Sequence, residues 1–245
     1  MRQQNLVTCV CPTYSRPMFV EQAVRLFSRQ TWRRAELLIL DDSPKDLQCS
    51  VKESDSVKVV RLPERVTMSH KHNLALKLAQ GDFVAHFDDD DWQSPMRLMR
   101  QLEALVLRGL DICGFPTGYL LTTGDARFWK FDRSFKSQAR FVGNSVIDYG
   151  IPVMDGSTMF RRAVVGDRQY PEMVTGQKVV FLHQLWKAGA KLEVLPNDGM
   201  YVYVRHSPSS SAVNTWQYGR DRRLAPTDRP SWFPAADLEF YRRAM

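Results

Sequence analysis

The sequence predicts an α/β fold in which helices flank a largely parallel sheet. Short apolar segments and segments of helical periodicity alternate along the first hundred residues, which is typical of parallel strands joined by helices. The chain has 245 residues, of which 44% are hydrophobic and 25% charged, so it can bury a sizeable core. Acidic residues directly follow two of the apolar segments, at the sheet edge where open α/β folds bind ligands.

The first half contains predicted strands and helices in alternation. The strands are short and apolar, and we place them at Leu6–Cys11, Glu36–Leu40, Val57–Leu62 and Phe83–Phe87. The helices have apolar residues at three- and four-residue spacing, and we place them from Arg16-Pro17 to about Gln30, at His70–Ala79 and at Pro95–Leu107. Right-handed crossovers bring the carboxyl ends of such strands to one edge of the sheet.

The second half is less regular. We place strands at Ile112–Leu121, Ser157–Phe160, Leu192–Leu195 and Met200–Val204, and helices at Val179–Lys187 and Asp237–Arg243. We expect one domain over residues 1–220, with halves at 1–110 and 111–220, followed by a C-terminal extension over 221–245. The extension's aromatic pairs, Trp232-Phe233 and Phe240-Tyr241, are expected to cap the core, and contact with a membrane surface or a partner subunit is the alternative.

The composition limits the classes of partner that the chain is expected to bind but does not identify one. The net charge of +7 favours an anionic partner such as a nucleotide, an acidic acceptor, a membrane surface or nucleic acid, although no nucleic-acid-binding motif is present. No apolar run approaches the ~20 residues that span a bilayer, and the first residues lack signal-peptide features, so we expect a cytoplasmic protein. Cys9 and Cys11 are interpreted as buried strand residues, because a zinc site needs a second cysteine pair.

The acidic segments indicate that the chain binds a metal ion together with substrate phosphates. Asp88–Asp91 puts four carboxylates in a row, and their repulsion requires a cation, solvent or basic partners. A hard divalent ion such as Mn²⁺ or Mg²⁺ prefers carboxylate oxygens and bridges to substrate phosphates, whereas a solvated acidic turn is the simpler alternative. Residues 1–80 contain no glycine, which excludes a dinucleotide fingerprint and a phosphate loop in that segment.

Three segments together resemble family 2 glycosyltransferases of the GT-A fold. They are Cys11–Pro17 (CPTYSRP), LLILDDSP and KHNLALKLAQGDFVAHFDDDDWQSPMRL, and the resemblance covers about residues 6–105. It resumes more weakly at GSTMFRR, which begins at Gly156, and at YVYVRH followed by Asn214-Thr215-Trp216. The resemblance implies a mixed central sheet, a first half that binds a nucleotide sugar and a second half that binds the acceptor. It also implies metal-dependent transfer of a sugar, with inversion, from a nucleotide-diphosphate donor, for which a UDP-sugar is favoured.

The resemblance also assigns expected roles to individual residues. It puts Pro12, Thr13, Tyr14, Arg16, Asp42, Lys71, His72, Asn73, Asp88 and Asp89 at the donor, with Asp42 on the base and Asp88 toward the ribose. It puts Asp90 on the metal, Asp91 near the metal or the sugar, and His206 within reach of the metal or the diphosphate. Simpler readings stay open: Tyr14 packs at a strand end, Lys71 and His72 form a solvated helix face, and His206 is a loop histidine. Trp92 and Trp216 are interpreted as packing residues rather than sugar platforms.

One departure from the family concerns the general base. The family usually has an aspartate in a Gly-Glu-Asp segment, whereas this chain reads Gly176-Gln177-Lys178, and a lysine accepts a proton only if its pKa is strongly lowered. Either another carboxylate serves, with Asp155 and Glu172 as candidates, or the acceptor is a phosphate or thiolate that needs little help, or the chain binds its donor without turnover. We favour the first. A nucleotidyltransferase is a further alternative, but its glycine-rich N-terminal loop is absent.

Overall fold

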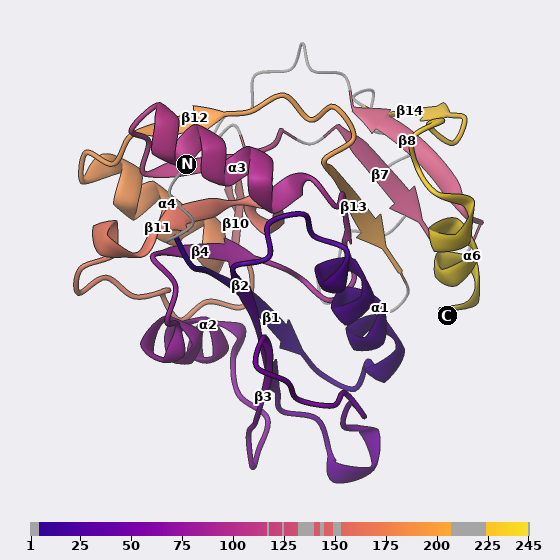
Figure 1. Cartoon of the computed structure of the whole chain (residues 1–245), viewed down its shortest axis with the longest axis horizontal. Helices are drawn as coiled ribbons and strands as arrows, with labels where there is room; N and C mark the ends of the chain where they lie inside the picture. Colours follow the sequence, from indigo (N-terminus) through magenta and orange to yellow (C-terminus); the bar gives the residue numbers. More distant parts are fainter. Residues whose placement is uncertain are drawn as a thin grey trace.

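A seven-stranded mixed sheet forms the centre of the computed structural model (Figure 1). The structure describes residues 5–116, 118–123, 125–131, 140–142, 145–148, 153–206 and 224–244. The sheet has the order β12-β6-β11-β4-β1-β2-β3. Its strands are β1 (Val7–Thr13), β2 (Ala35–Asp41), β3 (Val57–Arg61), β4 (Phe83–His86), β6 (Ile112–Gly114), β11 (Met159–Arg161) and β12 (Leu192–Val194).

Parallel pairing brings the predicted acidic segments to one edge. Strand β1 pairs in parallel with β2 on one side and with β4 on the other, and Thr13 lies opposite Asp41. Strand β11 runs antiparallel between β4 and β6, so the sheet is mixed. The carboxyl ends of β1, β2 and β4 therefore lie side by side, as the sequence predicts.

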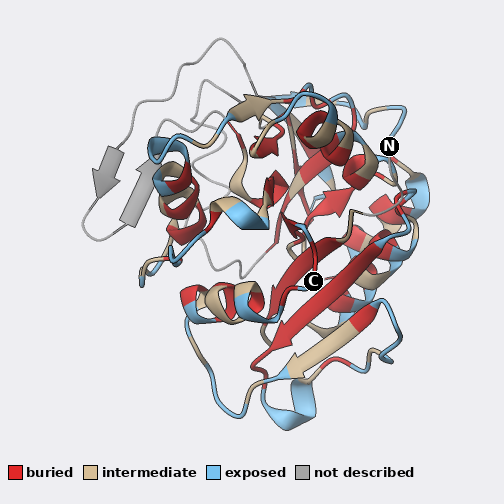
Figure 2. Cartoon of the chain, turned by 60° about the vertical axis from the view of Figure 1, so that its left-hand side comes forward, coloured by how far each residue is buried: buried red, intermediate tan, exposed pale blue. Residues whose placement is uncertain are grey.

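Helices cover both faces of this sheet. They are α1 (Pro17–Ser28), α2 (Met68–Leu78), α3 (Arg97–Leu107), α4 (Gln177–Lys187) and α6 (Ala235–Arg243), with short 3₁₀ turns η1 (Lys45–Leu47), η2 (Asp155–Ser157) and η3 (Arg162–Val164). Cys9 and Cys11 face one core cluster, with residues of α1, α3 and α6, whereas Val10 faces the other, with residues of α2 and α4. Burial on both faces explains why these strands are continuous apolar runs (Figure 2). Both cysteines are buried free thiols, which confirms the strand interpretation.

A second sheet lies beside the first and carries strands that the sequence pattern did not reveal (Figure 1). Its order is β14-β8-β7-β13-β5, with bounds β5 (Trp92–Gln93), β7 (Tyr119–Thr122), β8 (Arg127–Phe131), β13 (Tyr201–Arg205) and β14 (Leu224–Thr227). Strands β9 (Arg140–Val142) and β10 (Ser145–Asp148) form a separate antiparallel pair. The predicted strand Ile112–Leu121 is wrong as one element: it is split into β6 and β7, which belong to different sheets. Phe115 leaves the ladder by donating its N–H to Ser157, and Pro116 has no N–H to continue it.

The C-terminal helix α6 packs against α1 and the strand that follows the acidic run. Phe233 and Tyr241 are fully buried, so the prediction that the terminal aromatic residues cap the core is confirmed for these two. Asp237 pairs with Arg29, which directly follows α1, and accepts a hydrogen bond of 2.7 Å from Trp92 Nε1. Trp92 is 2% exposed, which confirms its packing role, while Trp216 lies outside the described residues. None of the helices in the described part of the chain has the length and apolar character needed to cross a bilayer.

Candidate donor and metal site at the carboxyl edge of the sheet

The ends of β1 and β2 are joined by one buried lysine. Lys71, on the first turn of α2, donates from Nζ to the Thr13 carbonyl oxygen at 2.6 Å and to Asp42 Oδ1 at 2.5 Å. The second Asp42 oxygen accepts the Val66 N–H at 2.9 Å. Lys71 is only 2% exposed and His72 only 1%, so the reading of these residues as a solvated helix face is wrong. Burial lowers the pKa of Lys71, although Asp42 opposes this shift.

The run Asp88–Asp91 relieves its repulsion by directing its first and last side chains to partners of their own, while Asp89 and Asp90 share Arg16. Asp88 accepts from Lys178 Nζ at 2.5 Å. Asp91 points inward, where Tyr201 Oη and the Val204 N–H donate to its two oxygens. Burial raises the pKa of Asp91 well above its ordinary value, and the neighbouring carboxylates Asp90 and Asp88 add to this shift.

The two middle aspartates lie close to Arg16 and His206. Asp89 accepts from Thr13 Oγ1 at 2.7 Å and pairs with Arg16 Nη2 at 2.9 Å. Asp90 Oδ2 lies 3.0 Å from Arg16 Nη1 and 3.0 Å from His206 Nε2. Burial raises the pKa of Asp89 to about 6, although Arg16 opposes the shift. Burial acts in the same direction on Asp90, but Arg16 and His206 outweigh it and hold the pKa of that carboxyl well below its ordinary value.

Comparison with known proteins now identifies the family. Residues 8–167 match the family described as Glycosyl transferase family 2, which is more than half of the chain. The chain belongs to this family. The putative teichuronic acid biosynthesis glycosyltransferase TuaG of Bacillus subtilis is 33% identical over 126 residues, which cover 49% of each chain. A GalNAc(5)-diNAcBac-PP-undecaprenol beta-1,3-glucosyltransferase of Campylobacter jejuni is 26% identical over 35% of this chain and 29% of its own length. The chain thus spans about half or less of the curated relatives that it matches.

Solved structures agree on the fold. Staphylococcus aureus TarS 1-349 in complex with UDP-GlcNAc superposes with a TM-score of 0.63 at 18% identity, over 85% of this chain and 61% of TarS 1-349. The mannosyltransferase PcManGT of Pyrobaculum calidifontis, in complex with GDP-Man and Mn²⁺, gives a TM-score of 0.57 at 16% identity, over 82% of this chain and 56% of PcManGT. These neighbours are GT-A glycosyltransferases, and the mixed α/β fold of this family 2 member is the one predicted.

The end of β1 is contacted by one residue that the sequence did not indicate. The Arg65 guanidinium carbon lies 4.3 Å from the centroid of the half-buried Tyr14 ring. Pro12 is buried within β1 opposite Leu40. Asn73 exchanges two hydrogen bonds with the backbone of Tyr170, so its amide anchors α2 to that segment instead of facing the carboxylates. Arg65 belongs to the segment between β3 and α2, and no local sequence pattern reveals that its guanidinium lies over Tyr14.

The structure distinguishes the three candidate general bases of this family 2 chain by their charge state and their position. Burial acts to lower the pKa of Lys178, but Asp88 and Asp155 outweigh it and raise the pKa above its ordinary value, so Lys178 stays protonated. This shift is opposite to what a general base needs, and Lys178 does not fit that role. Asp155 is half-buried and begins η2, next to Gly156, where a Cβ would lie 2.7 Å from an Asp88 oxygen.

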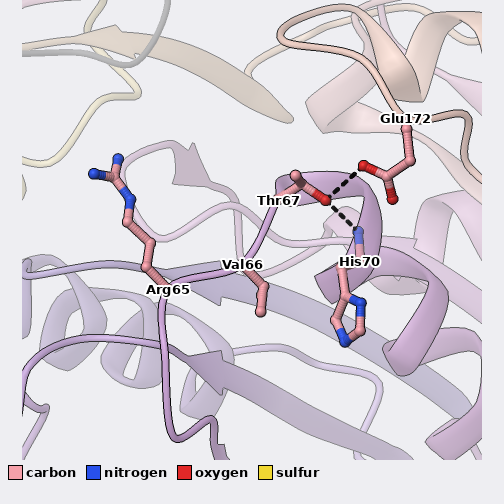
Figure 3. Close-up of a pocket in the computed structure, with 5 residues that line it drawn as sticks. All are labelled: Arg65, Val66, Thr67, His70 and Glu172. Atoms are coloured by element: carbon pink, nitrogen blue, oxygen red, sulfur yellow. Dashed lines mark hydrogen bonds between the residues drawn. The ribbon is translucent and has the colours of Figure 1, made fainter.

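Glu172 lines an open cavity of about 550 Å³ together with Arg65, Val66, Thr67 and His70 (Figure 3). Its carboxylate accepts from Thr67 Oγ1 at 2.8 Å, and Thr67 in turn caps α2 by accepting the His70 N–H at 3.1 Å. Glu172 is exposed and pairs with the start of α2. The site geometry therefore favours Asp155 over Glu172 as the carboxylate near the acidic run.

Two buried histidines that face Tyr170 lie beneath the site, and the sequence suggested a role for only one of them. His86 Nε2 lies 2.8 Å from Tyr170 Oη, and its Nδ1 contacts Thr158 Oγ1 at 2.6 Å. His72 packs against the same tyrosine with ring centroids 4.8 Å apart. Burial lowers the pKa of His72 to about 4 and that of His86 well below its ordinary value, so both rings are neutral at pH 7. Both rings are uncharged neighbours of Lys178, whose positive charge adds to the lowering of their pKa values.

Proposed function

We propose that this chain transfers a sugar from a nucleotide-diphosphate donor, with a UDP-sugar favoured, to an acceptor bound by residues 111–220. The observation that carries the proposal is the continuous link from Asp42 through Lys71, Thr13 and Asp89 to Asp90. It spans the β1, β2 and β4 ends, so a nucleoside at Asp42 and a diphosphate at Asp90 fit along one edge. Family membership and the fold shared with a UDP-GlcNAc complex of TarS support this choice.

The residues present fit a divalent cation, Mn²⁺ or Mg²⁺, at Asp90 and His206. Their nearest ligand atoms are 3.0 Å apart, and both belong to the donor sets that Mn²⁺ accepts. Within the described ranges no group of three or more His, Cys, Asp or Glu side chains is arranged to bind a metal, so Asp90 and His206 would hold the ion only together with donor phosphate oxygens and water. When bound, the ion neutralises charge on the departing diphosphate. Asp91 supplies no ligand in this proposal, because Tyr201 and Val204 occupy its oxygens.

We assign the remaining roles to side chains around that ion. Asp155 takes the proton of the acceptor hydroxyl as it attacks the anomeric carbon, with inversion. Lys178 holds Asp88 in place from the N-terminal turn of α4. Tyr14 and Arg65 border the nucleobase of the donor. Arg16 lies where its positive charge favours the diphosphate.

A second candidate is a donor-binding protein that does not turn over. The ion pair between Lys178 and Asp88 favours it, because it puts a protonated lysine where this family usually has a base. Both candidates predict donor binding, and only the transferase predicts release of nucleoside diphosphate in the presence of acceptor or water.

The test is incubation with labelled UDP-, GDP-, CDP- and dTDP-sugars with and without Mn²⁺, followed by measurement of nucleoside diphosphate release. We expect Mn²⁺-dependent release with one donor class, and loss of at least about hundredfold in Mn²⁺ affinity for Asp90→Ala. Asp89→Ala should be milder, and Glu239→Gln, on the exposed side of α6, serves as the control. Donor binding without release over hours favours the binder. Equal Mn²⁺-dependent donor binding by Asp90→Ala and the parent overturns the metal assignment.

A further inference from the structure

One arginine contacts both atoms of the proposed metal pair. Arg16 Nη1 lies 3.0 Å from Asp90 Oδ2 and 3.1 Å from His206 Nε2, and its Nη2 lies 2.9 Å from Asp89 Oδ1. The Arg16 side chain is 24% exposed and His206 only 4%. The guanidinium thus occupies the space where a cation would bind both ligands.

These contacts and metal binding compete for the same electron pairs. His206 Nε2 lies 3.1 Å from Arg16 Nη1 and 3.0 Å from Asp90 Oδ2, so it either accepts from Arg16 through its lone pair or donates an N–H to Asp90. A metal requires that lone pair, so its binding displaces Arg16 in the first case and the proton in the second. The Asp90 oxygen is likewise engaged by Arg16. A divalent ion about 2 Å from each ligand would lie within a few ångströms of the guanidinium, where like charges repel strongly in a partly buried site. Arg16 and the metal therefore cannot both hold this position.

We infer that Arg16 is an internal counter-ion, which neutralises Asp90 and holds His206 in the metal-free protein and is displaced when the metal binds. This inference rests on the proposed function, because it assumes the metal pair assigned there. Arg16 therefore competes with the metal, and the cost of breaking its contacts reduces the free energy of metal binding.

The surroundings allow this movement. The backbone of Arg16 is fixed, because Val20 N–H donates to its carbonyl oxygen and the preceding Ser15 N–H donates to Ser43 Oγ at 2.7 Å. Asp89 remains as a partner for Nη2, so the guanidinium can turn about this ion pair and expose Nη1. The released N–H groups then face the open edge where the diphosphate is proposed to bind.

A permanent structural counter-ion makes the opposite prediction. If Arg16 stayed in place and helped to shape the pair, its removal would weaken metal binding, as removal of a supporting residue does. If Arg16 competes, its removal strengthens metal binding. The sign of the change in Mn²⁺ affinity decides between the two.

The experiment is a titration of the full chain with Mn²⁺ alone, without nucleotide, with free Mn²⁺ measured by electron paramagnetic resonance. We expect Arg16→Gln to bind Mn²⁺ about tenfold more tightly than the parent, since about 1.4 kcal/mol of competing interaction corresponds to a factor of ten. Arg16→Lys keeps the charge but cannot contact Asp89, Asp90 and His206 together, so its affinity should lie between the two. Arg100→Gln, which removes an exposed charge from α3, should bind like the parent.

Thermal unfolding supplies a second readout and a check on folding. In EDTA, Arg16→Gln should unfold at a lower temperature than the parent, and Mn²⁺ should raise its midpoint by more. Unchanged or weaker Mn²⁺ binding in both Arg16 variants, with Asp90→Asn abolishing it, overturns this inference and leaves the metal site standing. If Asp90→Asn binds Mn²⁺ like the parent, the proposed metal pair fails as well. If no protein binds Mn²⁺ alone, the titration is repeated with UDP, whose phosphate oxygens are proposed to complete the shell, and absence of binding there also overturns the metal pair. If Arg16→Gln does not fold, tighter binding by Arg16→Lys supports the inference, and unchanged or weaker binding overturns it.

Discussion

At the scale of single residues, the acidic run works because its four side chains diverge. Asp88 pairs with Lys178, Asp91 accepts from Tyr201, and the two residues between them contact Arg16. These partners come from distant parts of the chain. Together they stabilise four adjacent carboxylates that would otherwise repel one another. Among the residues that the structure describes, Asp90 is the member of this run that has a histidine nitrogen at 3.0 Å.

The choice of general base yields the first prediction. Asp155→Asn should lower the rate of nucleoside diphosphate release by about 10² to 10⁴ while leaving donor affinity within about twofold, because loss of a base affects the proton transfer step. Single-turnover release and equilibrium donor binding measure the two quantities. Glu172→Gln is the matched control and should change release little. A large effect of Glu172→Gln with none for Asp155→Asn reverses the assignment.

Gly156 yields a second prediction at this scale. A Cβ at this position would lie 2.6 Å from Tyr201 Oη and 2.7 Å from Asp88 Oδ2, closer than side-chain atoms approach. Gly156→Ala should therefore displace the Asp88 carboxylate, weaken donor binding by about tenfold or more and cost about 1–3 kcal/mol of unfolding free energy.

The control for this crowding is Gly114→Ala. Its Cβ would meet Val153 Cβ at 2.9 Å, in the core and away from the carboxylates. We expect a comparable loss of stability in urea denaturation with unchanged donor affinity. Equal donor affinity in Gly156→Ala and the parent would show that this glycine does not shape the site.

The sequence pattern predicts the residues of the site that follow strands, and the family resemblance adds Arg16, Lys71 and His206, which the structure brings to the same edge. Asp42 and Asp90 follow apolar runs, so their meeting at one edge was predictable from parallel pairing. Tyr201 lies 110 positions from Asp91, and their contact depends on how β13 pairs with β5. Nothing local in the sequence encodes that pairing, and for this reason the inward turn of Asp91 was not foreseen.

At the scale of elements, helix α6 braces the strand that follows the acidic run. Asp237 receives two hydrogen bonds of 2.9 Å from Arg29, just after α1, and one of 2.7 Å from Trp92 on β5. Phe240 packs edge-on against Phe19, whose ring centroid lies 4.5 Å from that of His206. The helix itself was predictable from its amphipathic pattern, but its partners were not, because they lie in the first hundred residues of the chain.

This brace yields a third prediction. Asp237→Ala should lower the unfolding free energy by about 2–3 kcal/mol, because it leaves the buried Trp92 N–H and part of the Arg29 guanidinium without acceptors. Trp92→Phe removes one of these hydrogen bonds and should cost less. Urea denaturation measures both, and Glu239→Ala on the exposed face of α6 should stay within about 0.5 kcal/mol of the parent. An Asp237→Ala protein as stable as Glu239→Ala would mean that α6 does not brace β5 through this residue.

At the scale of the whole molecule, the main sheet was predictable, whereas of the second sheet the sequence pattern indicated β13 and part of β7 but not β5, β8 and β14. Strands β1, β2 and β4 are buried on both faces, so each is an apolar run that stands out in the sequence. Strands such as β5 contain as few as two residues and gain their pairing from the fold around them. The second sheet nevertheless positions Asp91 and His206, so the part of the fold least visible in the sequence completes the site.

The buried histidines connect the site to the stability of the whole fold. His72 has a pKa of about 4 in the folded chain and an ordinary value of 6.5 when unfolded. The unfolded chain therefore takes up protons that the folded chain does not, and the resulting stability is complete above about pH 6.5 and is lost as the pH falls toward 4. A pKa difference of this size corresponds to about 3 kcal/mol. His86, whose pKa is also lowered by burial, adds a loss of the same sign.

We accordingly expect the unfolding free energy, measured in urea at steps from pH 7.5 to 4.5, to fall steeply below pH 6.5. His72→Leu should reduce this slope, because it removes one of the groups whose protonation favours the unfolded chain. His70→Gln is the matched control: it lies on the same helix, but His70 is exposed, and the slope should stay as in the parent. If His72→Leu and the parent lose stability in parallel over this range, the acid sensitivity of the fold does not come from the histidine beneath the donor site.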